Sequence, residues 1–70
     1  MPDYSDAVEQ CEEILELIEE LPERAYEFGE SVAEKVRGIC ETIEEREEVT
    51  EKQQEALDNM EDGVRRWLRD

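Results

Sequence analysis

Apolar residues recur every third or fourth position along most of the chain, which is the spacing of one face of an α-helix. The first stripe consists of Tyr4, Val8, Cys11, Leu15 and Ile18, widened by Ala7, Ile14 and Leu21. It ends at Pro22, because the residue before a proline is driven out of the helical region. The pattern therefore predicts a first amphipathic helix over residues 4–20.

The same repeat resumes after the proline and keeps its phase to the end of the chain. Its apolar members are Ala25, Gly29, Val32, Val36, Ile39 and Ile43, then Leu57, Met60, Val64 and Trp67. Between the two groups, three stripe positions are polar, namely Arg46, Thr50 and Gln53. The apolar stripe is therefore weakest around residue 50.

The segment at this weak point has the form of a capping box. Thr50 and Gln53 are spaced so that the Thr hydroxyl accepts from one free amide of a new helix and the Gln side chain accepts from another. We therefore predict a second helix over residues 23–47 and a third over residues 51–69. One continuous helix from residue 25 to the end is the alternative, and it would need a partner to cover its stripe.

The predicted elements define an all-α fold class, since no alternating Val, Ile and Thr run indicates a strand. We expect a three-helix domain over residues 1–70, with the first two helices as an antiparallel hairpin and the third packed over them. Self-association through the third helix, giving a dimeric bundle, is left open. Gly29 is expected to allow close packing of the second helix on the first. Gly63 either ends the third helix early or is another close contact.

Charge excludes several classes of function. Eight Lys and Arg residues stand against 23 Asp and Glu residues, with no His, and the net charge is −15. Nucleic acid and anionic lipid surfaces repel such a chain, so we expect no direct binding to nucleic acid or to a membrane. The longest apolar run has two residues and the first ten residues lack the pattern of a signal peptide, so we expect a cytoplasmic protein.

The two cysteines are predicted to be reduced thiols. If the chain reverses at Pro22, facing positions have numbers that add up to about 44, which places Cys11 opposite Ala33. Cys40 then lies about 10 Å further along the axis, beyond the ~7 Å between Cα atoms that a disulfide allows. Cys11 lies on the apolar stripe and is expected in the core, whereas Cys40 flanks the stripe and is expected to be partly exposed.

Catalytic, metal and cofactor patterns are missing from the sequence. Paired carboxylates such as Glu12 and Glu13 point about 100° apart on a helix, and no Glu occupies the apolar stripe. Residues 58–63 resemble the start of a calcium loop, but Met60 and Arg69 stand at ligand positions. With no His and no CxxC pair, zinc, haem and thiol catalysis lack their usual ligands. We therefore predict no enzyme, no cofactor and no metal.

Acidic residues are concentrated in the first helix. The first 23 residues hold nine acidic residues and no basic one. The members of this acidic ridge that we single out for partner contact are Glu9, Glu12, Glu13, Glu16, Glu19 and Glu20. The ridge is either a solvated face that keeps the protein soluble or a mimic of nucleic-acid phosphates. It offers about one carboxylate per 3 Å, near half the charge density of duplex DNA at ~1.7 Å per charge.

Residues 64–69 form the only net-basic segment of the sequence. Arginines in a last helical turn complement the helix dipole, so a structural role is one interpretation. Trp and Arg are also common interface anchors. The alternative is therefore a partner-binding patch made by Leu57, Met60, Arg66 and Trp67.

One pattern resembles a known group of proteins. Phe28-x-x-Ser31, followed by Val49-Thr50-x-Lys52-Gln53-x-x-Ala56-Leu57, resembles a helix-cap-helix segment of small phage and bacterial proteins linked with DNA metabolism, most of them uncharacterised. The resemblance implies a break at Thr50 and a phage or mobile-element setting, and it does not include the acidic first helix.

Two functions follow from these patterns. The first is a non-enzymatic interaction or regulatory module that binds a protein partner through a helical face. The alternative is a nucleic-acid-mimicking inhibitor of a DNA- or RNA-binding protein, in which the ridge occupies the basic groove of its target.

Overall fold

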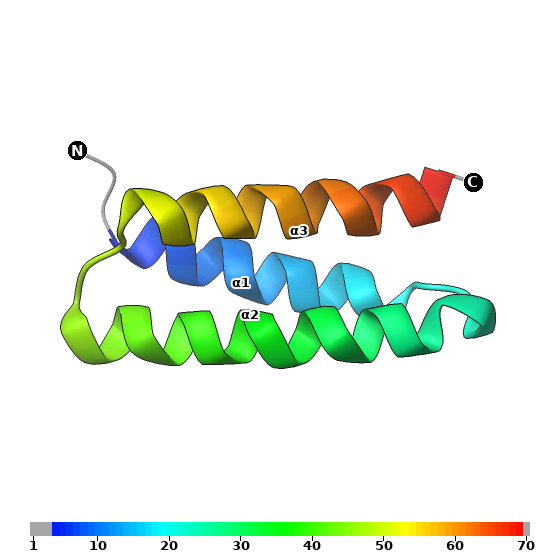
Figure 1. Cartoon of the computed structure of the whole chain (residues 1–70), viewed down its shortest axis with the longest axis horizontal. Helices are drawn as coiled ribbons and strands as arrows, with labels where there is room; N and C mark the ends of the chain where they lie inside the picture. The colour runs from blue at the N-terminus through cyan, green and yellow to red at the C-terminus, as the bar shows by residue number, and fades with distance from the viewer. Residues whose placement is uncertain (1–3, 70) are drawn as a thin grey trace.

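The computed structural model of the chain describes residues 4–69 and contains three α-helices. They are α1 (Tyr4–Glu19), α2 (Tyr26–Arg46) and α3 (Glu51–Arg69), with a short 3₁₀ turn η1 (Glu23–Ala25) before α2 (Figure 1). The predicted all-α class and three-helix architecture are therefore confirmed. The alternative of one continuous helix after Pro22 is wrong, because α2 and α3 are separated by residues 47–50.

The chain reverses after α1 in two steps. The amides of Glu20 and Leu21 donate to the carbonyls of Leu17 and Ile18 at 3.0 and 3.1 Å, which closes the last turn. Pro22 is extended, with φ −67° and ψ 158°, and the reversal follows in η1. Because the reversal comes after the proline rather than at it, Gly29 of α2 lies beside Ile18 and Leu21 and not opposite Leu15, where the register suggested by the sequence would place it.

The junction between α2 and α3 is the predicted capping box. The amide of Thr50 donates to Gln53 Oε1 at 2.9 Å, and the amide of Gln53 donates to Thr50 Oγ1 at 3.1 Å. Glu47, which ends α2, has a left-handed backbone with φ 55°. These two features end one helix and start the next within a few residues.

The core collects the apolar stripes of all three helices. Its buried members are Ala7, Cys11 and Ile14 from α1, Val32, Val36 and Ile43 from α2, and Leu57 and Val64 from α3. All of these are positions of the predicted stripes. Burial of this apolar surface is the main favourable term that holds three short helices together.

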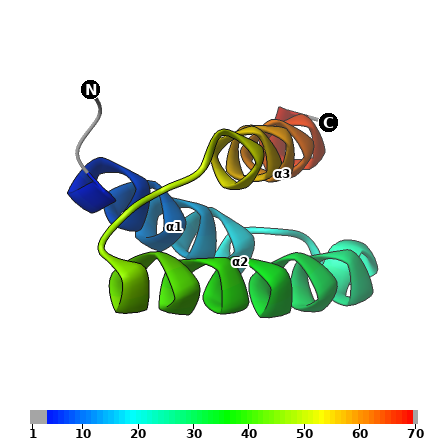
Figure 2. The same ribbon diagram turned by 60° about the vertical axis from the view of Figure 1, so that its left-hand side comes forward.

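Helix α1 packs along both other helices, whereas α2 and α3 have few contacts with each other. In Figure 1, α3 runs along the top and α2 along the bottom, and α1 lies between and behind them. Figure 2 shows that α2 and α3 are not parallel to each other. The antiparallel hairpin of α1 and α2 is confirmed. The third helix covers α1 rather than the middle of the hairpin, so one face of the α2 and α3 pair is left open.

Glycines behave as expected at two positions. An added Cβ at Gly29 would lie 3.1 Å from Ile18 Cγ2 and 3.1 Å from Leu21 Cδ1, so this glycine does allow α1 and α2 to approach closely. Helix α3 continues through Gly63, whose Cβ would lie 3.4 Å from Phe28 Cζ. Gly63 is therefore a contact point and not a helix end.

The predicted positions of the two cysteines relative to each other have to be corrected. Cys11 is fully buried and Cys40 is half-buried, as expected, and both are free thiols. The predicted separation is wrong, however, because the two thiols lie close enough to act on each other. Leu21, although past the end of α1, still packs beside Gly29. The extended residues therefore prolong the α1 side of the hairpin, which moves Cys40 toward Cys11.

None of the helices in residues 4–69 is both long and apolar enough to cross a lipid bilayer.

Candidate protein-binding surfaces

A groove lies between α2 and α3 on the face opposite α1. We call it the α2–α3 groove; it is shallow and open to solvent, with a volume of about 590 Å³. Its lining residues are Lys35, Gly38, Ile39 and Thr42 from α2, and Gln53, Ala56, Asn59 and Met60 from α3. The groove exists because α2 and α3 both pack on α1 and touch each other only sparingly.

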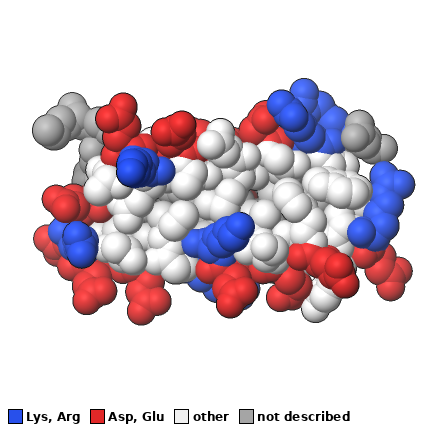
Figure 3. Space-filling model, viewed as in Figure 1, with Lys and Arg blue, Asp and Glu red and all other residues white. Residues whose placement is uncertain are grey.

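The lining of the groove differs in charge from the rest of the molecule. Of the described residues that line it, none is Asp or Glu, although the chain has 23 acidic residues. Figure 3 shows this face, with a mostly uncharged band along its middle that is interrupted by a basic side chain, and acidic side chains gathered along its upper and lower edges. A charge-poor band in a chain of net charge −15 is the kind of surface that a partner can dehydrate at low cost.

Gly38 leaves the wall of the groove open. A Cβ added at Gly38 would meet no atom within 4 Å. The residue is exposed to solvent and lies near the middle of the α2 sequence, away from both helix ends. Glycine in a helix interior costs about 1 kcal/mol relative to alanine. Unlike Gly29, Gly38 therefore has no packing role among residues 4–69 that offsets this cost.

A second hollow of about 280 Å³ continues the open face toward the end of α3. It is lined by Phe28, Gly63, Arg66 and Trp67. The rings of Phe28 and Trp67 are tilted by 37° with their centroids 6.1 Å apart, and the guanidinium of Arg24 lies 5.6 Å from the centroid of Trp67. Trp67 is thus half-buried and held by its own chain through an aromatic pair and a cation–π contact.

The partner-binding patch expected on α3 is only partly accessible. Met60 and Trp67 are half-buried and border the open face, and Arg66 is exposed and pairs with Asp62 at 3.1 Å. Leu57 is a correction: it is completely buried in the core, because its side of α3 is the side that α1 covers. A partner cannot contact Leu57 in the folded chain.

The acidic ridge lies on the outer face of α1. Its exposed members are Glu9, Glu12, Glu13, Glu16, Glu19 and Glu20. Arg65 of α3 donates to Glu13 Oε1 at 2.8 Å and to Glu61 Oε2 at 2.9 Å, so one ridge carboxylate already has a cation beside it. Since α1 packs on α2 and α3 with its other side, the ridge and the α2–α3 groove are on opposite faces of the molecule.

A polar cluster that the sequence did not indicate ties α1 to α3. Gln10 Nε2 donates to Asp58 Oδ1 at 2.9 Å and to Glu61 Oε1 at 3.2 Å, and Gln54 Nε2 donates to Gln10 Oε1 at 2.6 Å. The available signal was the position of Gln10 and Gln54 next to the apolar stripes of their helices. These hydrogen bonds hold one side of α3 against α1, so the side of α3 that lines the α2–α3 groove faces away from α1.

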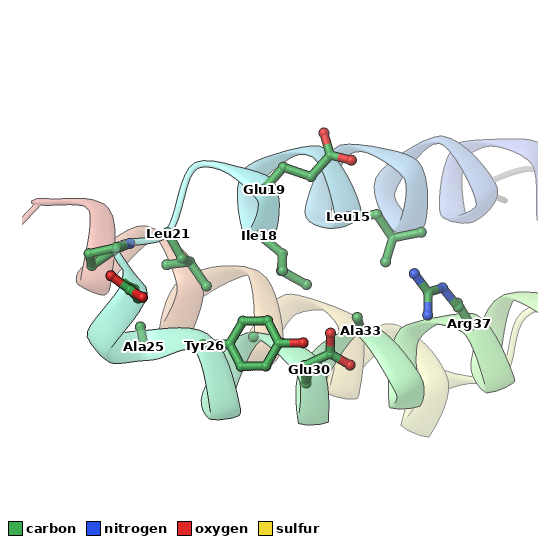
Figure 4. Close-up of a pocket in the computed structure, with 12 residues that line it drawn as sticks. Leu15, Ile18, Glu19, Leu21, Ala25, Tyr26, Glu30, Ala33 and Arg37 are labelled. Atoms are coloured by element: carbon green, nitrogen blue, oxygen red, sulfur yellow. The ribbon is translucent and has the colours of Figure 1, made fainter.

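Figure 4 shows a third hollow, along the seam between α1 and α2, of about 340 Å³. Its floor is apolar, from Leu15, Ile18 and Ala33, and Glu30 and Arg37 stand at its mouth. The ring of Tyr26 is exposed and its hydroxyl donates to Glu30, which raises the pKa of Tyr26. The hollow combines no nucleophile with a base, so it does not suggest a reaction.

The cysteines are not activated thiols. Burial, followed by the neighbouring Cys40, raises the pKa of Cys11 to about 12. Burial also raises the pKa of Cys40, which donates to Glu44 Oε1 at 3.6 Å. Reactive cysteines have a lowered pKa, so these side chains behave as apolar core and core-edge residues. Within residues 4–69, no three His, Cys, Asp or Glu side chains come together as a metal site.

Comparison of the chain with protein-family models, with curated protein sequences and with solved structures gives no match. The resemblance to helix-cap-helix segments of phage and bacterial proteins therefore stays a prediction.

Proposed function

We propose that the chain is a non-enzymatic interaction module that binds a protein partner through the α2–α3 groove. The observation that carries the proposal is the acid-free lining of this groove in an otherwise strongly acidic molecule. Ile39 and Met60 supply apolar contact area, and both are only half-buried by the chain itself. Apolar surface with a charged rim is the usual anatomy of a protein interface.

The shape of the groove favours a protein over a small molecule. Sites for small ligands are clefts that bury most of the ligand surface and converge several polar groups on it. The α2–α3 groove is an open depression between two helices, and a second hollow, lined by Gly63 and Trp67, lies further along the same two helices. An elongated partner surface fits these two hollows better than a compact ligand does.

Site-specific photo-crosslinking in living cells tests the proposal. A photoreactive phenylalanine derivative is placed at Ala56 in the groove, at Glu16 on the ridge, or at Glu44 on the opposite side of α2 as a matched control. We expect a defined protein adduct from Ala56 that Glu16 and Glu44 do not give. Equal adducts from all three positions, or none from Ala56, would overturn the assignment of the groove.

A second candidate function rests on a different face. Five ridge carboxylates are exposed, four of them on α1 and one in the turn that follows, and α1 carries no basic residue: Glu9, Glu12, Glu16, Glu19 and Glu20. They support the nucleic-acid-mimicking inhibitor as the alternative, in a phage or mobile-element setting. This function predicts an adduct from Glu16 to a DNA- or RNA-binding protein, and binding that falls steeply with salt. The Glu12→Lys and Glu16→Lys pair should then abolish binding.

For either function we propose a cytoplasmic location. Two free thiols fit a reducing compartment, although they lie close enough to interact.

A further inference from the structure

We propose that the occupant of the α2–α3 groove is an amphipathic helix of another protein, with Lys and Arg residues on both sides of its apolar stripe. The inference rests on the proposed function and adds the chemistry of the partner. In this arrangement the partner helix lies on the open face of α2 and α3, opposite α1, and covers that face as α1 covers the other.

The walls of the groove fit a helix. They are themselves two helices, and side chains of a third helix pack between them by the same ridges-into-grooves geometry that seats α1. The missing side chain of Gly38 and the small side chain of Ala56 face the groove from its two walls. Small residues let a helix backbone approach closely, which gives Gly38 a role that nothing within the chain provides.

The rims of the groove specify the charge of the partner. Gly38 on α2 is flanked four residues before and three residues after by Glu34 and Glu41. Asn59 on α3 is flanked at the same spacings by two more acidic residues, Glu55 and Asp62. Residues three and four apart are neighbours on a helix surface, and all four carboxylates are exposed. A partner with basic residues beside its stripe meets acid on both rims.

Charge also favours a basic helix over a second copy of the chain as the occupant of the groove. Two copies that met through their grooves would bring two acidic rims together in a dimer of two chains that each carry −15. Lys35, in the lining of each groove, would be the nearest cation. A basic amphipathic helix meets one like charge in the lining, Lys35, against the four carboxylates of the rims, so the net field attracts it.

The test uses three synthetic helical peptides of about 18 residues, ~27 Å long. The first has a Leu and Ala stripe flanked by Lys, the second has the same stripe flanked by Glu, and the third has the composition of the first with the stripe scrambled. Binding to the full chain is measured by fluorescence anisotropy, and amide chemical shifts locate the site. We expect the first peptide to bind at least tenfold more tightly than the other two, with shifts around Ile39 and Ala56.

Two pairs of variants separate the groove from general charge. Glu34→Lys with Glu41→Lys changes the rim, and Glu12→Lys with Glu16→Lys makes the same change in net charge on the ridge. We expect the rim pair to weaken the first peptide about tenfold and the ridge pair about twofold at most, because salt screens exposed charges beyond ~8–10 Å. Gly38→Gln, which fills the groove, should weaken binding about tenfold, while Gly38→Ala controls for the added helix propensity.

Four results would overturn the inference. They are equal binding of the Lys-flanked and scrambled peptides, shifts that map to α1, equal loss from the rim and ridge pairs, and a dimer in sedimentation that Gly38→Gln abolishes. If Ala56 still gives a protein adduct in cells, the proposed function survives and only the helical, basic character of the partner is wrong. If Ala56 gives no adduct, the function itself fails.

Discussion

Alanine substitution at the two glycines inside α2 gives opposite expectations. At Gly38 the new Cβ meets nothing within 4 Å, so the variant gains helix propensity without a packing cost. We expect Gly38→Ala to raise the free energy of unfolding by about 0.5–1 kcal/mol. In a domain of this size, each kcal/mol of added stability raises Tm by roughly 4–8 °C.

At Gly29 the same gain in propensity meets the packing of α1. The new Cβ would lie 3.1 Å from Ile18 Cγ2 and 3.1 Å from Leu21 Cδ1, closer than the ~3.5–4.0 Å of a normal carbon contact. Overpacking of this kind costs about 1–3 kcal/mol. Subtracting the ~1 kcal/mol of propensity leaves a net loss of about 0–2 kcal/mol, so Gly29→Ala should be the less stable variant by about 1–3 kcal/mol.

Urea unfolding, followed by circular dichroism and by the fluorescence of Trp67, measures both variants against the parent. The pair is internally matched, since the substitution and the helix are the same and only the neighbours differ. Equal stabilisation by both substitutions would refute the close approach of α1 and α2 at Gly29. Destabilisation by Gly38→Ala would show that the fold itself needs a glycine there, and would remove the reason to assign Gly38 to a partner.

Three further predictions concern the core and the helix ends. Burial raises the pKa of Cys11 to about 12 against 9.0 for the free thiol, so the folded chain keeps a proton that the unfolded chain loses. The Cys11 thiol should therefore lower stability by about 1.4 kcal/mol per pH unit above pH 9, toward pH 12, and pH-dependent unfolding of Cys11→Ala should show a smaller slope, with the part due to Cys40 remaining. Glu47→Gly should raise the free energy of unfolding by about 1 kcal/mol, because a left-handed backbone is strained for Glu and not for Gly, whereas a thermal melt of Glu48→Gly should show no gain. Thr50→Ala removes the hydroxyl that accepts from Gln53 and should cost about 1 kcal/mol in urea unfolding; an unchanged midpoint would contradict the capping role.

Local signals in the sequence predicted most of the fold. The proline, the capping box and the apolar repeat depend on neighbouring residues, so the close contact at Gly29 and most helix bounds followed from them, although α2 begins at Tyr26 and not at residue 23, where a 3₁₀ turn comes first. The register of Cys11 against Cys40 did not follow, because it depends on how many residues the reversal uses. That number is fixed by Leu21 packing beyond the end of α1.

The candidate site was harder to predict than the fold. A stripe position such as Leu57 is apolar in either case, whether a neighbouring helix or a partner covers it, so the sequence could not tell core from interface. The α2–α3 groove depends on which pairs of helices pack, and that is a tertiary choice. The one sequence signal for it was the run of positions free of acid along one side of the second and third helices, including Lys35, Gly38, Ala56 and Asn59.

The hydrogen bonds between α1 and α3 join residues that are 44 to 52 positions apart. The hairpin of α1 and α2 can therefore form from contacts closer in sequence, while the side of α1 around Gln10 and Ile14 stays uncovered until α3 docks. Until α3 docks, this side of α1 exposes apolar surface to chaperones and to other incompletely folded chains. Folding is completed only when the last helix closes on the first.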